Sequence, residues 1–148
     1  MESFNKKNDI DISRRGFMCG VAVLALSAFP DLAGAAGVSS KADGSTEILL
    51  SANKRLATVG GVVELNVKKY GRIAVVRSSK GVTGFSVFRL FCPHEGVIVK
   101  QSSEGWSCSP PRGHGAKFAL NGKVLVGPAK KDLQPIKFTA SSKSIIIK

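Results

Sequence analysis

From residue 47 onwards the chain consists of short apolar or alternating runs, and this pattern limits its possible folds more than any other feature. Glycine, serine, asparagine and lysine separate the runs, and no stretch beyond residue 35 keeps the periodicity of a helix. Ten short strands at this spacing are typical of an antiparallel sandwich or barrel. The predicted strands are Ile48–Ser51, Val62–Asn66, Arg72–Arg77, Phe85–Phe91, Val97–Lys100, Gly105–Cys108, Lys117–Leu120, Lys123–Val126, Ile136–Thr139 and Ser144–Ile147.

One turn and the size of the domain can also be predicted. Asn121 and Gly122 stand between two predicted strands, and both residue types tolerate the positive φ of a tight hairpin turn. The sequence has no internal repeat. Its 148 residues allow one compact domain, which excludes a self-contained multi-domain enzyme.

Residues 1–35 have the layout of a secretory signal. Arg14 and Arg15 precede Phe17, an apolar run follows over residues 20–29, and Ala33–Ala35 offers small residues for a signal peptidase. The paired arginines resemble a twin-arginine export signal, which acts as an address. We therefore expect export to the periplasm. The alternative is an uncleaved anchor that holds the protein at the membrane facing the periplasm, although the run is only about half the ~20 residues of a spanning helix.

The charge of the chain bears on its partners. There are 22 Lys and Arg against 10 Asp and Glu, and four of each sign fall within residues 1–35, so the whole excess of +12 remains on the 113 residues beyond. For an exported domain we expect no nucleic-acid partner. The charge favours encounter with an acidic protein surface or anionic lipid, or it is only a solvated face. Residues 36–46 are small and polar and predict a flexible leader, so the folded domain is expected over residues 47–148.

Cysteine and histidine are concentrated in two predicted loops. Cys92 and His94 follow one strand, and Cys108 and His114 follow another, with no other Cys or His after residue 35. Thiolate and imidazole are preferred ligands of zinc and of iron–sulfur centres. The pattern therefore predicts a metal centre. The alternative is a Cys92–Cys108 disulfide with two surface histidines.

The segments around these residues resemble, in order, the Rieske [2Fe–2S] proteins over roughly residues 47–148. Cys92–Gly96 is similar to the family's first C-x-H-x-G loop, and Trp106–Cys108 to the aromatic-x-Cys stretch before its second. His114–Phe118 and Asn121–Leu125 resemble the H-G-x-x-F and N-G-x-V segments that follow. Further similar segments are the strand Ile73–Arg77 and the covering stretch Gly127–Ala129 with Leu133.

The resemblance implies an all-β Rieske-like fold with two cluster-binding loops at one end. Cys92 and Cys108 would bind one iron of a [2Fe–2S] cluster, and His94 and His114 the other. It implies an electron-transfer protein without catalytic residues of its own, either a free carrier or the small subunit of a periplasmic oxidoreductase. The partner would be a c-type cytochrome or a larger oxidoreductase subunit with an acidic docking face.

The sequence departs from the family pattern at three places. Five residues separate Cys108 from His114 where the family has two, and we expect Gly113 to let the backbone turn back. The two cysteines that clip the loops together in quinol-oxidising members are missing. Ala116 and Phe118 replace a Ser and a Tyr that donate hydrogen bonds to sulfur in high-potential members. We therefore expect a reduction potential in the lower part of the Rieske range.

Three alternatives to the exported carrier stay open at this point. The first is the iron–sulfur subunit of a cytochrome bc complex, which oxidises quinol and is held by an uncleaved anchor. The second is a module in which the same two Cys and two His hold one Zn²⁺. The third is a Rieske-like interaction domain without a cluster. Two smaller expectations are that Trp106 is a core residue and that Lys130 and Lys131 are solvated or guide docking.

Overall fold

The computed structural model describes residues 36–109 and 113–148. The expected export signal, residues 1–35, and the segment 110–112 of the second candidate loop lie outside the described residues. Every regular element in the described part is a strand except one turn of 3-10 helix, η2 (Lys54–Ala57). Its strand pairs are all antiparallel. The all-β antiparallel class predicted from the sequence is therefore confirmed, and no helix in the described part could span a membrane.

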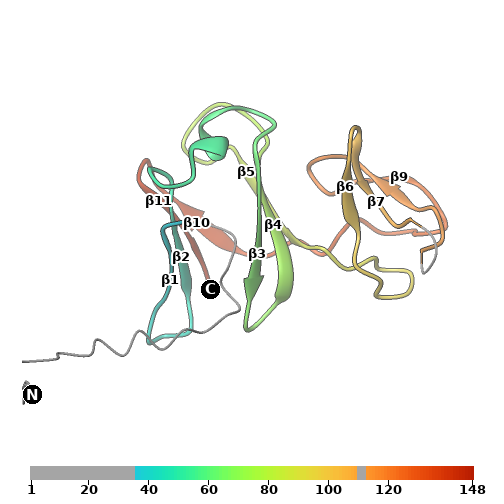
Figure 1. The fold of residues 1–148 in the computed structure, drawn as a ribbon, viewed down its shortest axis with the longest axis horizontal. Helices are drawn as coiled ribbons and strands as arrows, with labels where there is room; N and C mark the ends of the chain where they lie inside the picture. Colours follow the sequence, from blue (N-terminus) through green and yellow to red (C-terminus); the bar gives the residue numbers. More distant parts are fainter. Residues whose placement is uncertain (1–35, 110–112) are drawn as a thin grey trace, which may run out of the picture.

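The strands form three sheets that lie side by side in Figure 1. The first sheet has the order β1-β2-β11-β10, the second β3-β4-β5 and the third β6-β7-β8-β9. The strands are β1 (Val38–Ser40), β2 (Thr46–Leu49), β3 (Val62–Val67), β4 (Gly71–Arg77), β5 (Phe85–Arg89), β6 (Lys100–Ser102), β7 (Gly105–Ser107), β8 (Lys117–Phe118), β9 (Val124–Val126), β10 (Phe138–Ala140) and β11 (Ser144–Ile147).

Strand β4 is the centre of this arrangement. Successive side chains of a strand point to opposite faces. Ile73 and Val75 therefore pack toward the first sheet, while Ala74 and Val76 pack toward the third. All four are fully buried. This explains why the segment is a continuous apolar run and not an alternating one, since both faces of the strand are covered.

Two clusters of buried side chains fill the spaces between the layers. The basal core lies between the first and second sheets and consists of Ile48, Leu56, Val63, Leu65, Val67, Ile73, Val75, Phe85, Val87, Ile136, Ile145 and Ile147. The site core lies between the second and third sheets and includes both cysteines. Its members are Val62, Ala74, Val76, Phe88, Leu90, Cys92, Val99, Trp106, Cys108, Ala116, Phe118, Ala129 and Leu133.

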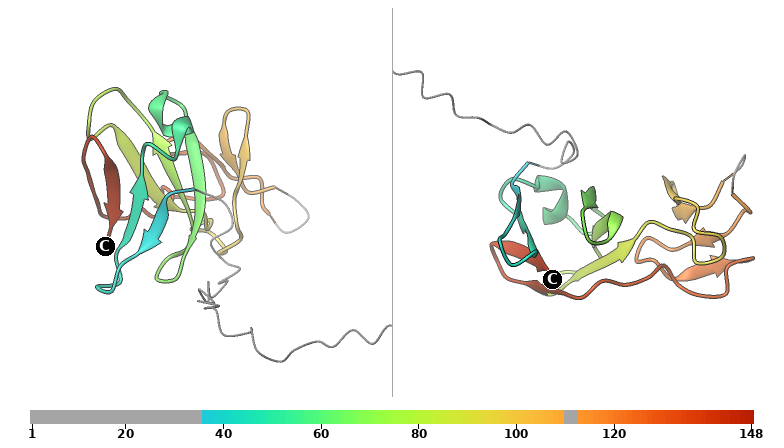
Figure 2. Two further views of the ribbon diagram at one scale, coloured as in Figure 1. Left: turned by 60° about the vertical axis from the view of Figure 1, so that its left-hand side comes forward. Right: turned by 90° about the horizontal axis from the view of Figure 1, so that it is seen from below.

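The segment between β9 and β10 ties the layers together. Figure 2 shows it running from the third sheet back to the first along one side of the molecule. It lies against β5, because the amide of Arg89 donates to the carbonyl of Gln134 (2.9 Å) and the amide of Ile136 donates to the carbonyl of Val87 (2.8 Å). The end of the molecule that carries the candidate ligands is therefore fastened to the basal part by hydrogen bonds as well as by apolar contact.

The predicted hairpin at Asn121 and Gly122 is confirmed between β8 and β9. The amide of Gly122 donates to the carbonyl of Ala119 (2.9 Å), and the amide of Ala119 donates to the carbonyl of Lys123 (2.7 Å). Gly122 has φ +88°, and a Cβ there would lie 3.1 Å from the ring of Phe88. Glycine thus permits both the turn and the close packing of the third sheet on the second.

Residues 36–46 do not form the flexible leader expected from their composition. Val38–Ser40 form β1 and pair with β2, and the side-chain amide of Asn53 donates to the carbonyl of Ala36 (2.7 Å). The short β1 lies at the edge of its sheet, and Ser39 and Ser40 are exposed. Because its partners are backbone groups, this strand needs no apolar alternation, and composition alone could not reveal it.

Two further strands begin later than predicted. The run Val97–Lys100 was expected to be a strand, but the ladder starts at Lys100, and the run Ile136–Thr139 gives way to β10 from Phe138. Val99 and Ile136 are nevertheless buried in the two cores. Their apolar character thus reflects burial beside the ladder and not pairing within it.

Candidate metal centre

The first candidate loop follows β5 and closes back on Cys92. The amide of Cys92 donates to the carbonyl of Val97 (2.8 Å), and the amide of Gly96 donates to the carbonyl of Cys92 (2.7 Å). Cys92 packs in the site core and is 2% exposed, while His94 at the tip faces solvent. One short loop therefore presents a buried thiol and an exposed imidazole.

The second candidate loop follows β7 and closes in the same way. The amide of Cys108 donates to the carbonyl of Ala116, and the amide of Gly115 donates to the carbonyl of Cys108, both at 2.8 Å. Cys108 is fully buried and His114 is exposed. These two bonds hold the backbone just after His114 against Cys108.

Gly113 permits this closure because it has no side chain. A Cβ at this position would lie 2.4 Å from the carbonyl carbon and oxygen of Cys108 and 2.5 Å from the carbonyl oxygen of Ser109. The requirement is for close approach of two backbone segments, which only a residue without a side chain allows.

The two cysteines form the buried half of the site. Both are free thiols in the site core, so the alternative of a Cys92–Cys108 disulfide is not the state of this structure. Burial raises the pKa of the Cys108 thiol, and the neighbouring Cys92 thiol raises it further, while the backbone amide of His114 lowers it. Burial therefore favours the neutral thiol of Cys108. A bound metal cation would favour the thiolate.

The two histidines form the exposed half. The rings of His94 and His114 lie 5.1 Å apart between centroids, at an interplanar angle of 70°. Their side chains are 34% and 40% exposed. The structure thus pairs the two thiols in the site core and the two imidazoles at the surface, on two adjacent loops.

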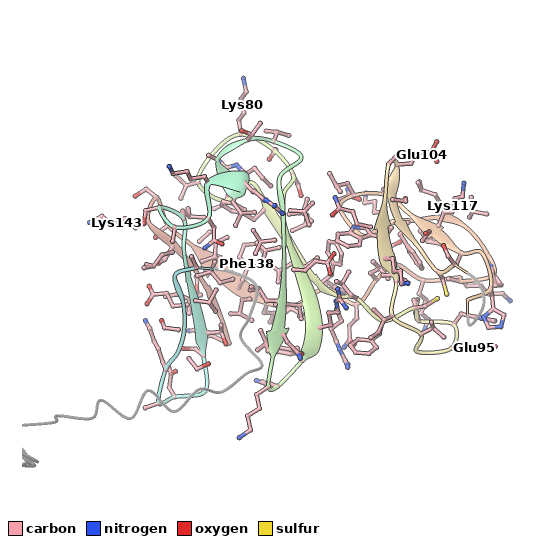
Figure 3. All side chains as sticks on the ribbon, viewed as in Figure 1. Lys80, Glu95, Glu104, Lys117, Phe138 and Lys143 are labelled. Atoms are coloured by element: carbon pink, nitrogen blue, oxygen red, sulfur yellow. The ribbon has the colours of Figure 1, made fainter. Side chains whose placement is uncertain are left out.

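Glu95 is a residue of this site that the sequence did not single out. Its carboxylate Oε2 lies 3.3 Å from His114 Nε2, and its Oε1 lies 3.9 Å from His94 Nδ1. Potential ligand atoms of Glu95 and both histidines all lie within 4.8 Å of one another. The available signal was its place directly after His94, but only the fold shows that it also reaches His114. Figure 3 places Glu95 at the end of the molecule opposite Lys143.

Aromatic and aliphatic side chains surround the sulfur half of the site. Trp106 is buried as expected, packs edge-on against Phe88 at 5.7 Å and donates its indole N–H to the carbonyl of Leu120 (3.1 Å). Ala116 and Phe118 are also buried there, and neither side chain has a group that donates to sulfur. The sulfur atoms are therefore shielded from water. The side chains at positions 116 and 118 donate no hydrogen bond to them.

The covering stretch predicted from the sequence packs on the same core. Ala129 and Leu133 belong to the site core, and the amide of Leu133 donates to the carbonyl of Gly122 (2.9 Å). Asp132 accepts a hydrogen bond from the amide of Val124 (2.8 Å). Lys130 and Lys131, which lie between these anchors, are solvent-facing, so this stretch holds two positive charges on the part of the molecule that contains the candidate ligands.

The fold and site together define a three-layered β protein with two thiols and two imidazoles collected on adjacent loops. No protein-family model and no curated protein matches the chain. Among solved structures it is similar to the cyanobacterial plasma membrane Rieske protein PetC3 from Synechocystis PCC 6803. The two are 35% identical, the match covers 60% of this chain and 86% of that chain, and the TM-score is 0.47. Because this identity extends over most of the Rieske protein, the chain belongs to the Rieske family. The assignment rests on the sequence identity and its coverage, not on the superposition.

Proposed function

We propose that this protein holds a Rieske-type [2Fe–2S] cluster and carries one electron at a time. The observation that carries the proposal is the convergence of Cys92 and Cys108 in the site core with the rings of His94 and His114 5.1 Å apart at its exposed edge. Two thiols and two imidazoles are the donor set that a Rieske cluster takes, with the sulfurs on one iron and the nitrogens on the other. When bound, such a cluster supplies a one-electron couple.

The two halves of the donor set have different roles in this proposal. Cys92 and Cys108 hold the protein-facing side, where Trp106 and Phe118 exclude water. His94 and His114 form the solvent-facing side, through which an electron passes to or from a partner. A donor set of two buried thiols and two exposed imidazoles fits a carrier or an electron-transfer subunit better than a self-contained enzyme.

We further infer that the domain works outside the cytoplasm. The support is the twin-arginine-like segment at residues 1–35, because that route is known for carrying folded proteins with their cofactors. Periplasmic location after cleavage is the first alternative, and a retained anchor is the second. The related structure is that of a plasma membrane protein, which supports the second alternative.

The partner is inferred from charge. A net charge of +12 favours a c-type cytochrome or a larger oxidoreductase subunit with an acidic docking face. Lys130 and Lys131 stand on the stretch that packs over the site core, so they are suited to guide such a partner. The missing clip cysteines count against a quinol-oxidising cytochrome bc subunit.

Metal analysis of the purified full-length protein tests the proposal. We expect two iron and two acid-labile sulfide per chain, and an EPR signal that appears on reduction. Zinc in place of iron would support the module with one Zn²⁺ on the same four residues. Protein that binds no metal would support an interaction domain without a cluster. Either result would overturn the electron carrier.

The third cysteine of the chain provides the matched control. Cys108→Ser is expected to lose the iron, since it removes a buried thiol of the site. Cys19→Ser removes a thiol from the segment 1–35 and is expected to keep the iron content of the wild type. Equal iron content in both variants would contradict the assignment of Cys108 as a ligand.

A further inference from the structure

Glu95 places a negative charge beside both candidate histidines. Its two carboxylate oxygens face different rings, with Oε2 at 3.3 Å from His114 Nε2 and Oε1 at 3.9 Å from His94 Nδ1. Among the described residues, the basic side chains in contact with its carboxylate are these two histidines. A group on the first loop thus contacts the ring of the second, and this links the two loops at their exposed ends.

Backbone hydrogen bonds fix the position of the Glu95 backbone relative to the two histidines. Glu95 lies inside the turn closed by the bonds from Cys92 to Val97 and from Gly96 to Cys92, so its Cα cannot move independently of His94. His114 is held from the other side by the bonds between Cys108 and residues 115 and 116. The two closed loops therefore hold the backbone of Glu95 near both histidines, within reach of its carboxylate.

We propose that Glu95 is a positioning and tuning residue, whose carboxylate stabilises the oxidised state of the centre and so lowers its reduction potential. The inference rests on the proposed function. Reduction adds one electron and breaks no bond, so the oxidised centre carries one more unit of positive charge than the reduced centre. A negative charge in contact with the ligand rings favours the more positive state. Carboxylates that contact metal-bound histidines act in the same direction by raising the basicity of the ligand.

The test compares two substitutions that change the net charge equally. Glu95→Gln keeps the size of the side chain and removes its charge. Glu104→Gln does the same at the turn between β6 and β7, where Glu104 lies 3.8 Å from Lys117 and is far more exposed. Figure 3 shows Glu104 and Glu95 at separate places on the same end of the molecule. Glu95→Asp restores the charge on a shorter side chain.

The expected result is an upward shift of the midpoint potential in Glu95→Gln only. At a fixed applied potential the ratio of reduced to oxidised protein should rise about tenfold, which is about 59 mV for a one-electron couple. Glu95→Asp should lie nearer the wild type, and the shift should diminish at high salt because the carboxylate is half exposed. Pulsed EPR on protein with ¹⁵N-histidine should show an altered nitrogen coupling in Glu95→Gln and not in Glu104→Gln.

Failure of this inference and failure of the proposed function give different results. If wild-type protein and both Gln variants carry the cluster, but the potential of Glu95→Gln moves no more than that of Glu104→Gln, the tuning role is wrong and the carrier stands. If wild-type protein has no iron, the proposed function is wrong and the tuning role falls with it.

Discussion

The carbonyl oxygen of Cys108 accepts a hydrogen bond from the amide of Gly115 at 2.8 Å, across a loop that is longer than its family counterpart. The return bond, from the amide of Cys108 to the carbonyl of Ala116, completes a ladder at the base of the loop. With this ladder in place, His114 lies beside His94, with 5.1 Å between the ring centroids.

Gly113→Ala is predicted to disrupt this closure. The new Cβ would lie 2.4 Å from backbone atoms of Cys108, and the backbone has to move away to relieve the clash. We expect iron per chain to fall at least severalfold, with the far-ultraviolet circular dichroism spectrum retained, because the basal core does not include this loop. Gly127→Ala is the matched control, since its Cβ would approach no atom nearer than 4.0 Å. Equal iron content in the two variants would show that the close approach is not needed.

Ala116 and Phe118 have no side-chain group that donates a hydrogen bond to sulfur. We therefore predict a reduction potential in the lower part of the Rieske range. Ala116→Ser would introduce a hydroxyl next to Cys108 in the site core and is expected to raise the potential. A hydrogen bond that favours the reduced state by about 1.4 kcal/mol corresponds to about 59 mV. Ala129→Ser, in the same core, controls for the polar substitution itself. A wild-type potential typical of quinol-oxidising members, or no rise in Ala116→Ser, would contradict this prediction.

If positive charge guides docking, the rate of electron transfer depends on where the charges lie as well as on the net charge. Lys130→Glu with Lys131→Glu is expected to reduce the rate of electron transfer to an acidic c-type cytochrome about tenfold or more at low salt. Lys80→Glu with Lys143→Glu makes the same change in net charge away from the site, as Figure 3 shows, and should have a much smaller effect. Stopped-flow mixing at several ionic strengths measures both. Equal rates in the two double variants would indicate that only net charge steers the encounter.

The hairpin of β1 and β2 is predicted to loosen in acid. Hydrogen bonds from the side chain and amide of Ser45 hold the pKa of Asp43 below its usual value, and hydrogen bonds from Ser144 and Lys41 do the same for Glu47. Lowered pKa values mean that these contacts stabilise the fold above the ordinary carboxylate pKa of about 4 and are lost as the pH falls through the folded values.

Hydrogen exchange measures this effect at the amide of Lys41, which donates to the carbonyl of Ser45 (2.8 Å). Its protection factor should fall between pH 5 and pH 2 more than that of residues in β4. Asp43→Asn should remove much of this pH dependence. Protection that stays constant over that range would contradict the role of these carboxylates.

Much of the fold was predictable because burial leaves a clear pattern in the sequence. The run Ile73–Val76 is apolar since it is covered on both faces, and Asn121 with Gly122 marks a turn that few other residues can make. Strand β1 was not predictable, because its pairing uses backbone groups of a polar segment. The late starts of β6 and β10 reflect apolar residues that are buried outside the ladders.

The candidate site was predictable in its residues and not in its detailed geometry. The interleaved cysteines and histidines stand out because no others occur beyond residue 35. The sequence left open whether His114 returns to Cys108, because that depends on backbone bonds between residues 108 and 116 and on the close approach at Gly113. The proximity of Glu95 to His114 is a contact between loops, for which one sequence carries no signal.

Pulsed EPR of the reduced full-length protein labelled with ¹⁵N-histidine tests the central claim most directly. If Cys92, Cys108, His94 and His114 hold a [2Fe–2S] cluster, the spectrum contains couplings from two histidine nitrogens. His94→Cys and His114→Cys would each remove one of them. A signal without histidine coupling, or reduced protein without a signal, would contradict the account.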